Sequence, residues 1–369
     1  MLVNGAGGIA GDSIVKSMIH DQFSKSGFGR GRTADVAPAN KDYVHFFFSG
    51  LFFHFSKGRA LRMKITKEST LTFYSFFSFI FSMSKQLVIF GCGYLGSELA
   101  RQAIELGWHV SAVTRNTDTA ASLNDAGVHK VVVADLDDDS WSGEIDSTQD
   151  YVVNCVGAAS NDLDGYLKSY VDGQDSVVKW ARDGKVGTYV FTSSTSVYPQ
   201  TERQLIDETA SSDGVSERGG LLLAAEQLGF PGGGGIGRSF ILRLAGLYGP
   251  GRHLFLENVR NGVTQSGDGD RILNLIHRDD ATSAILAVLQ ADDNNIGRIY
   301  NLSDGNPSSR AEIAEWLAKK LGVDAPSFAD SDESDASNRK ISNNRIRDEL
   351  NWSPSFPSFR EGYNSILEK

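Results

Sequence analysis

Short apolar runs alternate with longer stretches of mixed polarity along most of this chain. Runs rich in Val, Ile, Leu and Phe occupy residues 87–90, 109–113, 130–134, 151–156, 188–192 and 240–244. Such nearly continuous apolar runs are typical of parallel strands that are buried on both faces. Residues 117–126, 161–181 and 218–228 have the pattern of helices between these strands. The pattern predicts an α/β fold with a Rossmann-type, doubly wound parallel sheet.

The pattern changes after residue 249. Glycines interrupt residues 250–269. The pattern after them predicts a strand at 271–277, a helix at 280–290, a strand at 298–301 and a helix at 310–321 that ends at Gly322. We expect loops at the glycine-rich residues 232–237 and the acidic residues 330–335. The prediction is a nucleotide-binding Rossmann domain at 83–249 and a small C-terminal α/β substrate lobe at 250–369. Some elements of that lobe are expected to return to the sheet.

Residues 1–82 have a different composition. They contain 10 Lys and Arg against 5 Asp and Glu, and 13 of the 21 phenylalanines. Their apolar residues do not recur with the spacing of a helix or a strand. Their longest apolar-leaning run, residues 71–83, is short for a membrane span, and no standard secretory signal is evident. Two interpretations stay open, a targeting or anchoring extension and a mis-predicted gene-model segment, with the second slightly favoured. We expect a cytoplasmic protein, or one of an organelle matrix or stroma if the extension is real.

A glycine turn follows the first apolar run. Residues 91–96 read GCGYLG, so that Gly91, Gly93 and Gly96 have the spacing G-x-G-x-x-G between a strand and a helix. In a dinucleotide site the first glycine permits the tight turn, the second lets the backbone approach a pyrophosphate, and the third allows close packing of the helix on the sheet. The pyrophosphate would lie at the helix N-terminus, beside Cys92, Tyr94 and Leu95.

The end of the second strand indicates which dinucleotide is preferred. An NAD site usually has Asp or Glu there to accept from the ribose 2′-hydroxyl, but this strand ends in Thr114 and Arg115. A guanidinium can pair with a 2′-phosphate, so NADP is preferred over NAD, although a solvated Arg115 is the alternative. Asp135 is placed to accept from the adenine amino group or to cap a turn. Leu136, Val156 and Gly157 complete the predicted cofactor set.

Charge and cysteine content narrow the function further. The net charge of −10 argues against a general nucleic-acid or membrane-surface binder, because phosphate contacts need clustered Lys and Arg. Two cysteines, Cys92 and Cys155, cannot form a disulfide framework or a cysteine-rich metal site, and we expect small buried thiols. No metal is predicted. The expected partner is a small-molecule substrate.

Six ordered blocks resemble one known superfamily. The glycine turn is the first, and it is followed by FTSSTSVY at 191–198, DET at 207–209, RLAGLYGPGR at 243–252, NLIHRDD at 274–280 and YNLSD at 300–304. Together they resemble the extended short-chain dehydrogenase/reductases, in the NAD-dependent epimerase/dehydratase group, over about residues 85–367. The resemblance implies catalysis of hydride transfer with a nicotinamide cofactor, often on a nucleotide-sugar substrate. Relatives often dimerise through a four-helix interface, so the resemblance implies a homodimer.

The chain departs from this superfamily at its catalytic pair. The superfamily usually carries Tyr-x-x-x-Lys before an Ala-Glu pair, and the lysine lowers the tyrosine pKa for proton transfer. Counting back from Ala225-Glu226 puts Arg218 at the tyrosine position and Leu222 at the lysine position. A shifted register does not restore the motif, because residues 199–247 contain no tyrosine and residues 186–318 no lysine. The resemblance is therefore to an atypical member.

Three residues are candidates for a replacement catalytic site. The resemblance gives Ser194 the place of the catalytic hydroxyl, with an ordinary turn serine as the alternative. Arg218 could hold an anionic substrate or stabilise negative charge but cannot shuttle a proton, and a surface arginine is its alternative. Tyr198 is the phenol nearest to Ser194 in the sequence.

For the substrate, the candidates are Arg243, Arg252 and His277. Arginines suit phosphates, whereas Arg243 within a strand could instead be structural and paired with a carboxylate. A lone histidine at a strand end is more often structural.

Two hypotheses on the function follow. The first is an NADP-dependent oxidoreductase or epimerase on a small polar or nucleotide-sugar-like substrate. The second is a catalytically silent NADP-binding redox sensor or partner subunit.

Overall fold

The computed structural model describes residues 43–48, 51–56, 84–137, 139–292, 297–329 and 337–368. The chain divides into two compact units, Met1–Ser84 and Lys85–Lys369. In the first unit, β1 (Tyr43–Phe48) pairs antiparallel with β2 (Leu51–Ser56). The rest of the predicted extension and the acidic loop at 330–335 lie outside the described residues. Among the helices that are described, none has the length and apolar character that would let it cross a bilayer.

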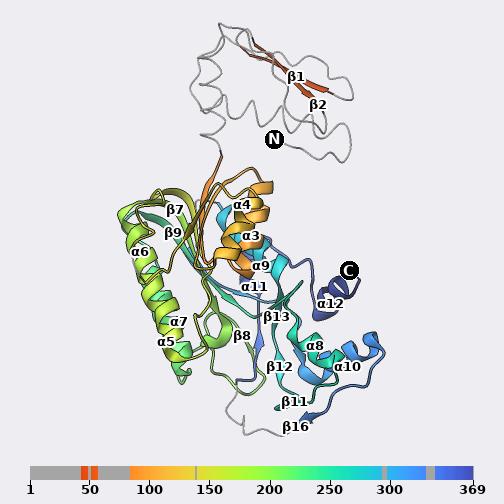
Figure 1. Cartoon of the computed structure of the whole chain (residues 1–369). Helices are drawn as coiled ribbons and strands as arrows, with labels where there is room; N and C mark the ends of the chain where they lie inside the picture. Colours follow the sequence, from red (N-terminus) through yellow and green to blue (C-terminus); the bar gives the residue numbers. More distant parts are fainter. Residues whose placement is uncertain are drawn as a thin grey trace. The chain divides into compact units, whose positions relative to one another are not determined.

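A seven-stranded sheet forms the centre of the second unit (Figure 1). All its neighbouring strands are parallel, in the order β14-β9-β7-β6-β3-β4-β5. Their bounds are β3 (Gln86–Phe90), β4 (His109–Thr114), β5 (Lys130–Val133), β6 (Thr148–Asn154), β7 (Lys185–Ser194), β9 (Ile236–Leu244) and β14 (Gly297–Leu302). The six apolar runs and the run at 298–301 are therefore all strands of one sheet. The prediction of a doubly wound Rossmann-type fold is confirmed.

Helices cover both faces of this sheet. Alternate residues of β3 enter different cores, with Leu87 and Ile89 in one and Val88 and Phe90 in the other, because successive side chains of a strand point to opposite faces. The first core is completed by α3 (Tyr94–Glu105), α4 (Thr117–Asp125), α9 (Arg278–Leu289) and α11 (Asn344–Leu350). The second is completed by α6 (Gly173–Asp183) and α7 (Glu217–Gly229).

The helical stretch before α6 is not uniform. It begins with α5 (Leu163–Tyr166), passes through the π-helical turn η1 (Leu167–Asp172) and then continues as α6. The sequence pattern predicted a helix here but not the π-helical turn, whose i→i+5 hydrogen bonds widen one turn of the helix. In Figure 1 this segment lies beside α7.

Much of the chain after residue 249 packs around a separate core. Its helices are α8 (Leu254–Arg260), α10 (Arg310–Leu321) and α12 (Phe359–Leu367), and α10 ends at Gly322 with a φ of 68°, as predicted. Short strands border this region in four pairs: β10 (Gly246–Tyr248) with β13 (Leu275–His277), β12 (Ile272–Leu273) with β15 (Ser308–Ser309), β11 (Gln265–Ser266) with β16 (Phe328–Ala329), and β8 (Leu205–Ile206) with β17 (Lys340–Ile341).

The strand expected at 271–277 is interrupted. Asn274 separates β12 from β13, and its side chain bonds the neighbouring backbone in both directions: Nδ2 donates to the carbonyl of Arg339 and Oδ1 accepts from the N–H of Ile341. These bonds tie Asn274 to Arg339, directly before β17, and to Ile341 within it. Side-chain pairing of this kind competes with a regular ladder, which explains the break.

The strand order places a crevice at the carboxyl edge of the sheet. From β3 the chain passes to β4 and β5 on one side, and then returns to β6 on the other side of β3. Connections therefore leave β3 and β6 in opposite directions. In open α/β sheets ligands bind at such a switch point, outside the carboxyl ends of the strands.

Candidate nucleotide-binding site

A cavity of about 500 Å³ lies at this switch point. Residues at the carboxyl ends of β3, β4, β5, β6 and β7 line it, together with residues of η1 and residues that follow β9. We distinguish two ends. The cofactor end contains the glycine turn and the residues that follow β4 and β5. The substrate end contains Tyr170, Thr192, Ser193, Leu244, Leu247 and Arg252.

The glycine turn has the geometry that a pyrophosphate requires. Gly91 has a φ of 79°, and a Cβ there would lie 2.5 Å from the Cα of Val156. A Cβ at Gly96 would lie 2.7 Å from the carbonyl oxygen of Gly91, so this glycine lets α3 pack closely on the turn. A Cβ at Gly93 would meet open space. That space lies at the N-terminus of α3, where the cap position makes no side-chain hydrogen bond and the first N–H groups can bind an anion.

Most of the predicted cofactor residues line this cavity. They are Gly91, Gly93, Tyr94, Leu95, Arg115, Asp135, Leu136, Val156 and Gly157. Cys92 and Gly96 are not lining residues. The Cys92 side chain is fully buried in the core on the α3 face, where burial raises the thiol pKa, and Gly96 acts through the packing described above.

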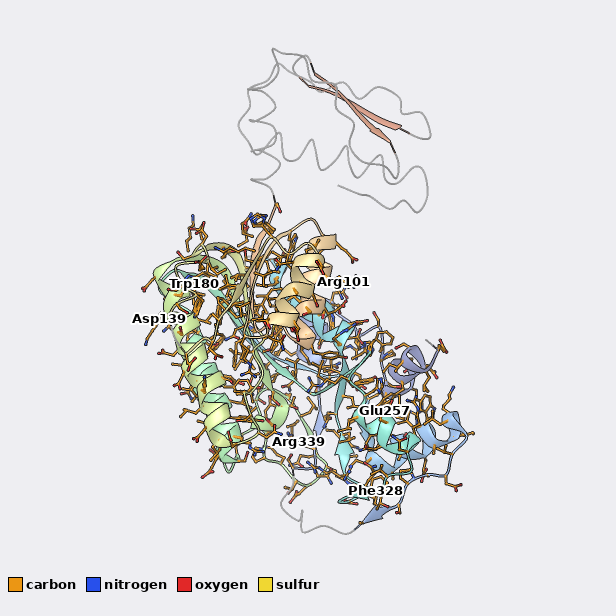
Figure 2. All side chains as sticks on the ribbon, in the orientation of Figure 1. Arg101, Asp139, Trp180, Glu257, Phe328 and Arg339 are labelled. Carbon is orange, nitrogen blue, oxygen red and sulfur yellow. The ribbon has the colours of Figure 1, made fainter. Side chains whose placement is uncertain are left out.

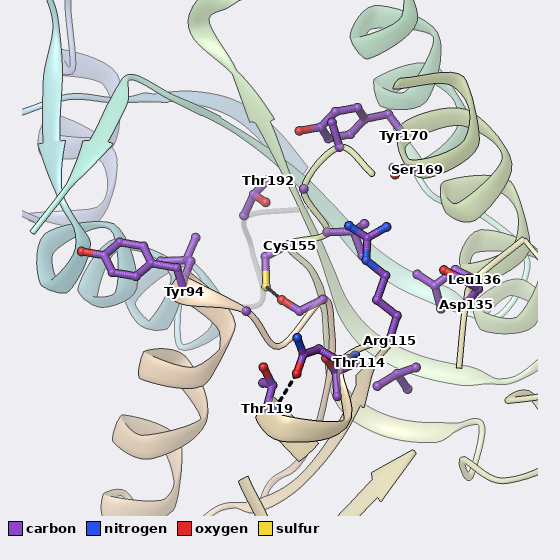
Figure 3. A pocket seen from close by; sticks show the side chains of 18 of the residues that line it. Tyr94, Thr114, Arg115, Thr119, Asp135, Leu136, Cys155, Ser169, Tyr170 and Thr192 are labelled. Atoms are coloured by element: carbon purple, nitrogen blue, oxygen red, sulfur yellow. Dashed lines mark hydrogen bonds between the residues drawn. The ribbon is translucent and has the colours of Figure 1, made fainter. Parts of the chain in front are cut away.

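Arg115 extends into the cofactor end from the carboxyl end of β4 (Figure 3). Within the described part of the chain its guanidinium has no hydrogen bond or ion pair. Thr114, Asn116 and Thr119 line the same part of the cavity, and the Asn116 side chain caps α4 by accepting from the N–H of Thr119 at 2.8 Å. This arrangement combines a guanidinium with the start of a helix, and both favour a phosphate group.

Asp135 also lines the cofactor end, where it is paired. The Lys168 ammonium lies 3.6 Å from an Asp135 carboxylate oxygen and 3.1 Å from one of Asp137. These two carboxylates raise the pKa of Lys168. Lys168 belongs to η1, so its ion pairs with Asp135 and Asp137 link the residues after β5 to the helical turn across the cavity. The lysine was not among the predicted site residues.

At the substrate end several hydroxyl groups are already engaged. Ser193 donates to Glu226 at 2.6 Å, and Thr192 donates to the carbonyl of Asn154 at 3.3 Å. The Arg252 guanidinium carbon lies 5.6 Å from the centre of the Tyr94 ring, and among the described residues it has no hydrogen bond or carboxylate partner. Of the three predicted substrate residues, Arg252 is the one that lines the cavity.

The structure does not bring Arg243 or Tyr198 to the cavity. Arg243 is buried and forms an ion pair with Glu226 at 2.7 Å, the structural alternative considered above. The Tyr198 hydroxyl is buried as well; it accepts from Arg243 and donates to Asn301, each at 2.8 Å. Burial raises the pKa of Tyr198, and its side chain is enclosed in the protein core, away from the cavity lining.

Ser194, Arg218 and His277 also lie outside the cavity lining. The Ser194 hydroxyl accepts from the N–H of Ser196 at 3.1 Å and so caps η2 (Thr195–Val197). Arg218 is exposed on α7, where it donates to the carbonyl of Asn161 and lies over the Tyr166 ring. His277 is buried and caps α9 by accepting from the N–H of Asp279. The helix therefore begins at Arg278, two residues before the predicted start.

Sequence reasoning missed the η1 residues Lys168, Ser169 and Tyr170, all of which line the cavity. Their positions could have been found from one signal. They belong to the helical stretch that follows β6, and the helix after such a strand begins at the carboxyl edge of the sheet. A period of 3.6 residues describes the buried face of that helix but not which of its residues face the ligand.

Comparisons with known proteins agree with this geometry. Residues 87–303 match the model of the NAD-dependent epimerase/dehydratase family. Protein YeeZ of Escherichia coli (strain K12) is 30% identical over 74% of this chain and 97% of its own. The short-chain dehydrogenase/reductase family 42E member 1 of Danio rerio is 32% identical over 29% of this chain and 30% of its own. A UDP-glucuronic acid 4-epimerase from Bacillus cereus, solved in complex with NAD, has a TM-score of 0.66 at 20% identity over 76% of this chain and 98% of its own.

The chain belongs to the NAD-dependent epimerase/dehydratase family. The resemblance drawn from the six sequence blocks is thereby confirmed, and so is the short-chain dehydrogenase/reductase type of fold. The structural neighbour, at 20% identity, supports the fold alone.

Proposed function

We propose that this chain is an NADP-dependent oxidoreductase or epimerase that acts on a small polar or nucleotide-sugar-like substrate. The observation that carries the proposal is the cavity at the switch point. It joins the glycine turn of Gly91 and Gly93 to a substrate end where the Arg252 guanidinium has no ion-pair partner among the described residues. When bound, a nicotinamide cofactor would supply reversible hydride transfer.

Arg115 supports NADP as the preferred cofactor. It lines the cavity where an NAD site usually has a carboxylate, and the N-terminus of α4 and the Thr119 side chain are beside it. Asp118 in the first turn of α4 would oppose a phosphate, but it is not a lining residue. A 2′-phosphate at this position would satisfy the guanidinium, whereas a 2′-hydroxyl would leave it without an anionic partner.

Arg252 supports an anionic group on the substrate. Its guanidinium is at the substrate end, lies over Tyr94 and has no carboxylate partner among the described residues. Arginine pairs with phosphate or carboxylate in a bidentate manner, which adds orientation to charge attraction. The Bacillus cereus neighbour is a UDP-glucuronic acid 4-epimerase, and UDP-glucuronic acid carries both a phosphate and a carboxylate group.

A catalytically silent NADP-binding protein is the second candidate, and α7 is the observation that favours it. Arg218 stands at the usual tyrosine position, exposed and outside the cavity lining. Leu222 stands at the lysine position and is buried in a core with Val197 and Ile206. The usual proton relay therefore has no counterpart on this helix.

Two measurements on the full chain separate the candidates. Calorimetry with NADPH tests cofactor binding, and a panel of carbonyl compounds and nucleotide sugars, followed by NADPH absorbance and product chromatography, tests turnover. Binding with turnover supports the enzyme. Binding without turnover across the panel supports the silent protein, and no binding of either NADPH or NADH would contradict both.

We also propose a homodimer whose interface is formed by two helical parts of the chain, the continuous stretch α5–η1–α6 and the separate helix α7. Leu163 and Leu167 are 41% and 42% exposed and stand four residues apart, so they lie on one face of the helix. Sedimentation of a Leu163→Arg/Leu167→Arg variant should show monomers. Leu254→Arg, at an exposed leucine of α8, is the matched control and should sediment as the wild type does. A wild-type protein that sediments as a monomer would contradict the proposal.

A further inference from the structure

The cavity contains two phenols, Tyr94 and Tyr170, and their hydroxyl groups differ in position. The Tyr94 hydroxyl lies against the backbone of Gly249, where a Cβ would come within 2.8 Å of it, and the atom is shielded from solvent. Figure 3 shows the Tyr94 ring directed away from Cys155 and Arg115. Tyr170 lies at the substrate end with Ser169 and Thr192.

Tyr170 stands on the π-helical turn η1, four residues into the six-residue span Leu167–Asp172. A π-helical turn is less favourable than a regular one and occurs mostly as a single wide turn, frequently at functional sites. This turn brings three consecutive residues, Lys168, Ser169 and Tyr170, to the cavity wall. In a regular helix three consecutive residues span about 200° of the circumference, and the wider π-helical turn reduces this angle.

The surroundings of Tyr170 leave its proton available. The Tyr170 hydroxyl forms no hydrogen bond with another described residue, so its O–H is free to donate to a ligand. The nearby backbone of Ala158 lowers the phenol pKa. Among the other lining hydroxyls, those of Thr192 and Ser193 already donate to protein acceptors.

Arg252 and Tyr166 are the ionisable groups that act on Tyr170. Burial raises the pKa of Tyr170, which is the largest effect, and Tyr166 raises it further, whereas the Arg252 charge lowers it. The two rings are 5.3 Å apart, but Tyr166 does not line the cavity. A guanidinium near a phenol stabilises the phenolate, as the absent lysine would have done on α7.

We propose that Tyr170 is the catalytic acid and base of this site, and that it replaces in function the tyrosine that α7 lacks. The proposal rests on the proposed function. In the direction of reduction, a bound reduced nicotinamide would supply the hydride that the carbonyl carbon of the substrate accepts. The Tyr170 O–H bond breaks as the O–H bond of the product alcohol forms, and the phenolate then takes a proton from water. Oxidation of an alcohol follows the reverse path.

A first test needs no substrate. Protein labelled with ¹³C at the tyrosine Cζ is titrated with NADP⁺ and with NADPH, and the Tyr170 and Tyr166 resonances are assigned by their loss in Tyr170→Phe and Tyr166→Phe. The Tyr170 signal should shift with both cofactors, by different amounts because the oxidised nicotinamide ring carries a positive charge, and the Tyr166 signal should shift far less. Cofactor binding without a shift of the Tyr170 signal would overturn the proposal and leave the proposed function standing.

A second test measures turnover of whichever carbonyl substrate the panel identifies. Tyr170→Phe should lower kcat by about 100-fold or more, with a smaller change in KM and no loss of NADPH affinity, because a positioned acid contributes ~10²–10⁴ in rate. Tyr363→Phe, at a phenol of α12 that does not line the cavity, is the control and should keep wild-type kcat. Full activity of Tyr170→Phe would overturn the proposal, whereas failure of the wild type to bind either cofactor would overturn the proposed function itself.

Discussion

The two ends of the cavity are built in different ways. The cofactor end depends on the backbone of one continuous segment, the turn from Gly91 to Gly96, and on Arg115 directly after the next strand. The substrate end depends on side chains from η1, β7 and the segment after β10, which are far apart in the sequence. A backbone turn tolerates little change, whereas side chains contributed by separate elements can be exchanged one at a time. The comparison explains how a chain can combine the glycine turn with an α7 that carries neither a tyrosine nor a lysine.

The largest effect is expected at Arg243, which underlies the substrate end without lining it. Arg243→Met removes the partner of a buried carboxylate, so we expect the free energy of unfolding to fall by about 3–5 kcal/mol. Glu226 is 5% exposed and would keep an uncompensated charge. Chemical denaturation measures the loss.

The double variant Glu226→Gln/Arg243→Met is the control, since it removes both charges and should lose less stability than the single variant. A fully stable Arg243→Met that binds substrate more weakly would show instead that Arg243 belongs to the site.

At the cofactor end, Gly91→Ala and Gly93→Ala should behave differently. The Cβ of the first would press into the Val156 backbone at a φ that disfavours alanine, so we expect a loss of about 2–4 kcal/mol in stability and loss of NADPH binding. The Cβ of the second would enter open space where a pyrophosphate would lie. Gly93→Ala should keep its melting temperature and lose only NADPH affinity.

Calorimetry and thermal melting together separate the two variants. Equal NADPH binding by Gly93→Ala and the wild type would mean that no pyrophosphate approaches this turn, and the description of the cofactor end would then be wrong.

A smaller effect is expected at Asp304, a buried carboxyl that follows β14. Burial raises the pKa of this carboxyl to about 7, and the charges of Asp280 and Glu361 act in the same direction. The folded state therefore holds a proton that the unfolded chain releases at about pH 4, so the contribution of Asp304 to stability falls as pH rises from about 4 to about 7.

Asp304→Asn removes this penalty and keeps the oxygen that accepts from the N–H of Asn306. The variant should be more stable than the wild type at about pH 8 and nearly equal to it at about pH 4. Denaturation at the two pH values measures the difference. A variant that is less stable at the higher pH would contradict the assignment.

The sequence predicts features that depend on neighbouring residues better than features that depend on residues far apart in the chain. The strands follow from apolar runs, and the turn follows from glycine spacing, because both depend on neighbouring residues. The alternative of a structural Arg243 was also open from its place within a strand. The position of Tyr170 depends on a π-helical turn, which local patterns do not reveal. The enclosure of Tyr198 depends on Arg243 and Asn301, at separations of 45 and 103 residues.

The proposed preference for NADP depends most directly on Arg115. The deciding measurement is the dissociation constant of NADPH and of NADH, determined by calorimetry for the full chain and for Arg115→Ala, with Arg260→Ala on the exposed face of α8 as the matched control. We predict that the wild type binds NADPH about tenfold more tightly than NADH, that Arg115→Ala loses this preference, and that Arg260→Ala keeps it. Equal or tighter binding of NADH by the wild type, or an unchanged preference in Arg115→Ala, would contradict the account.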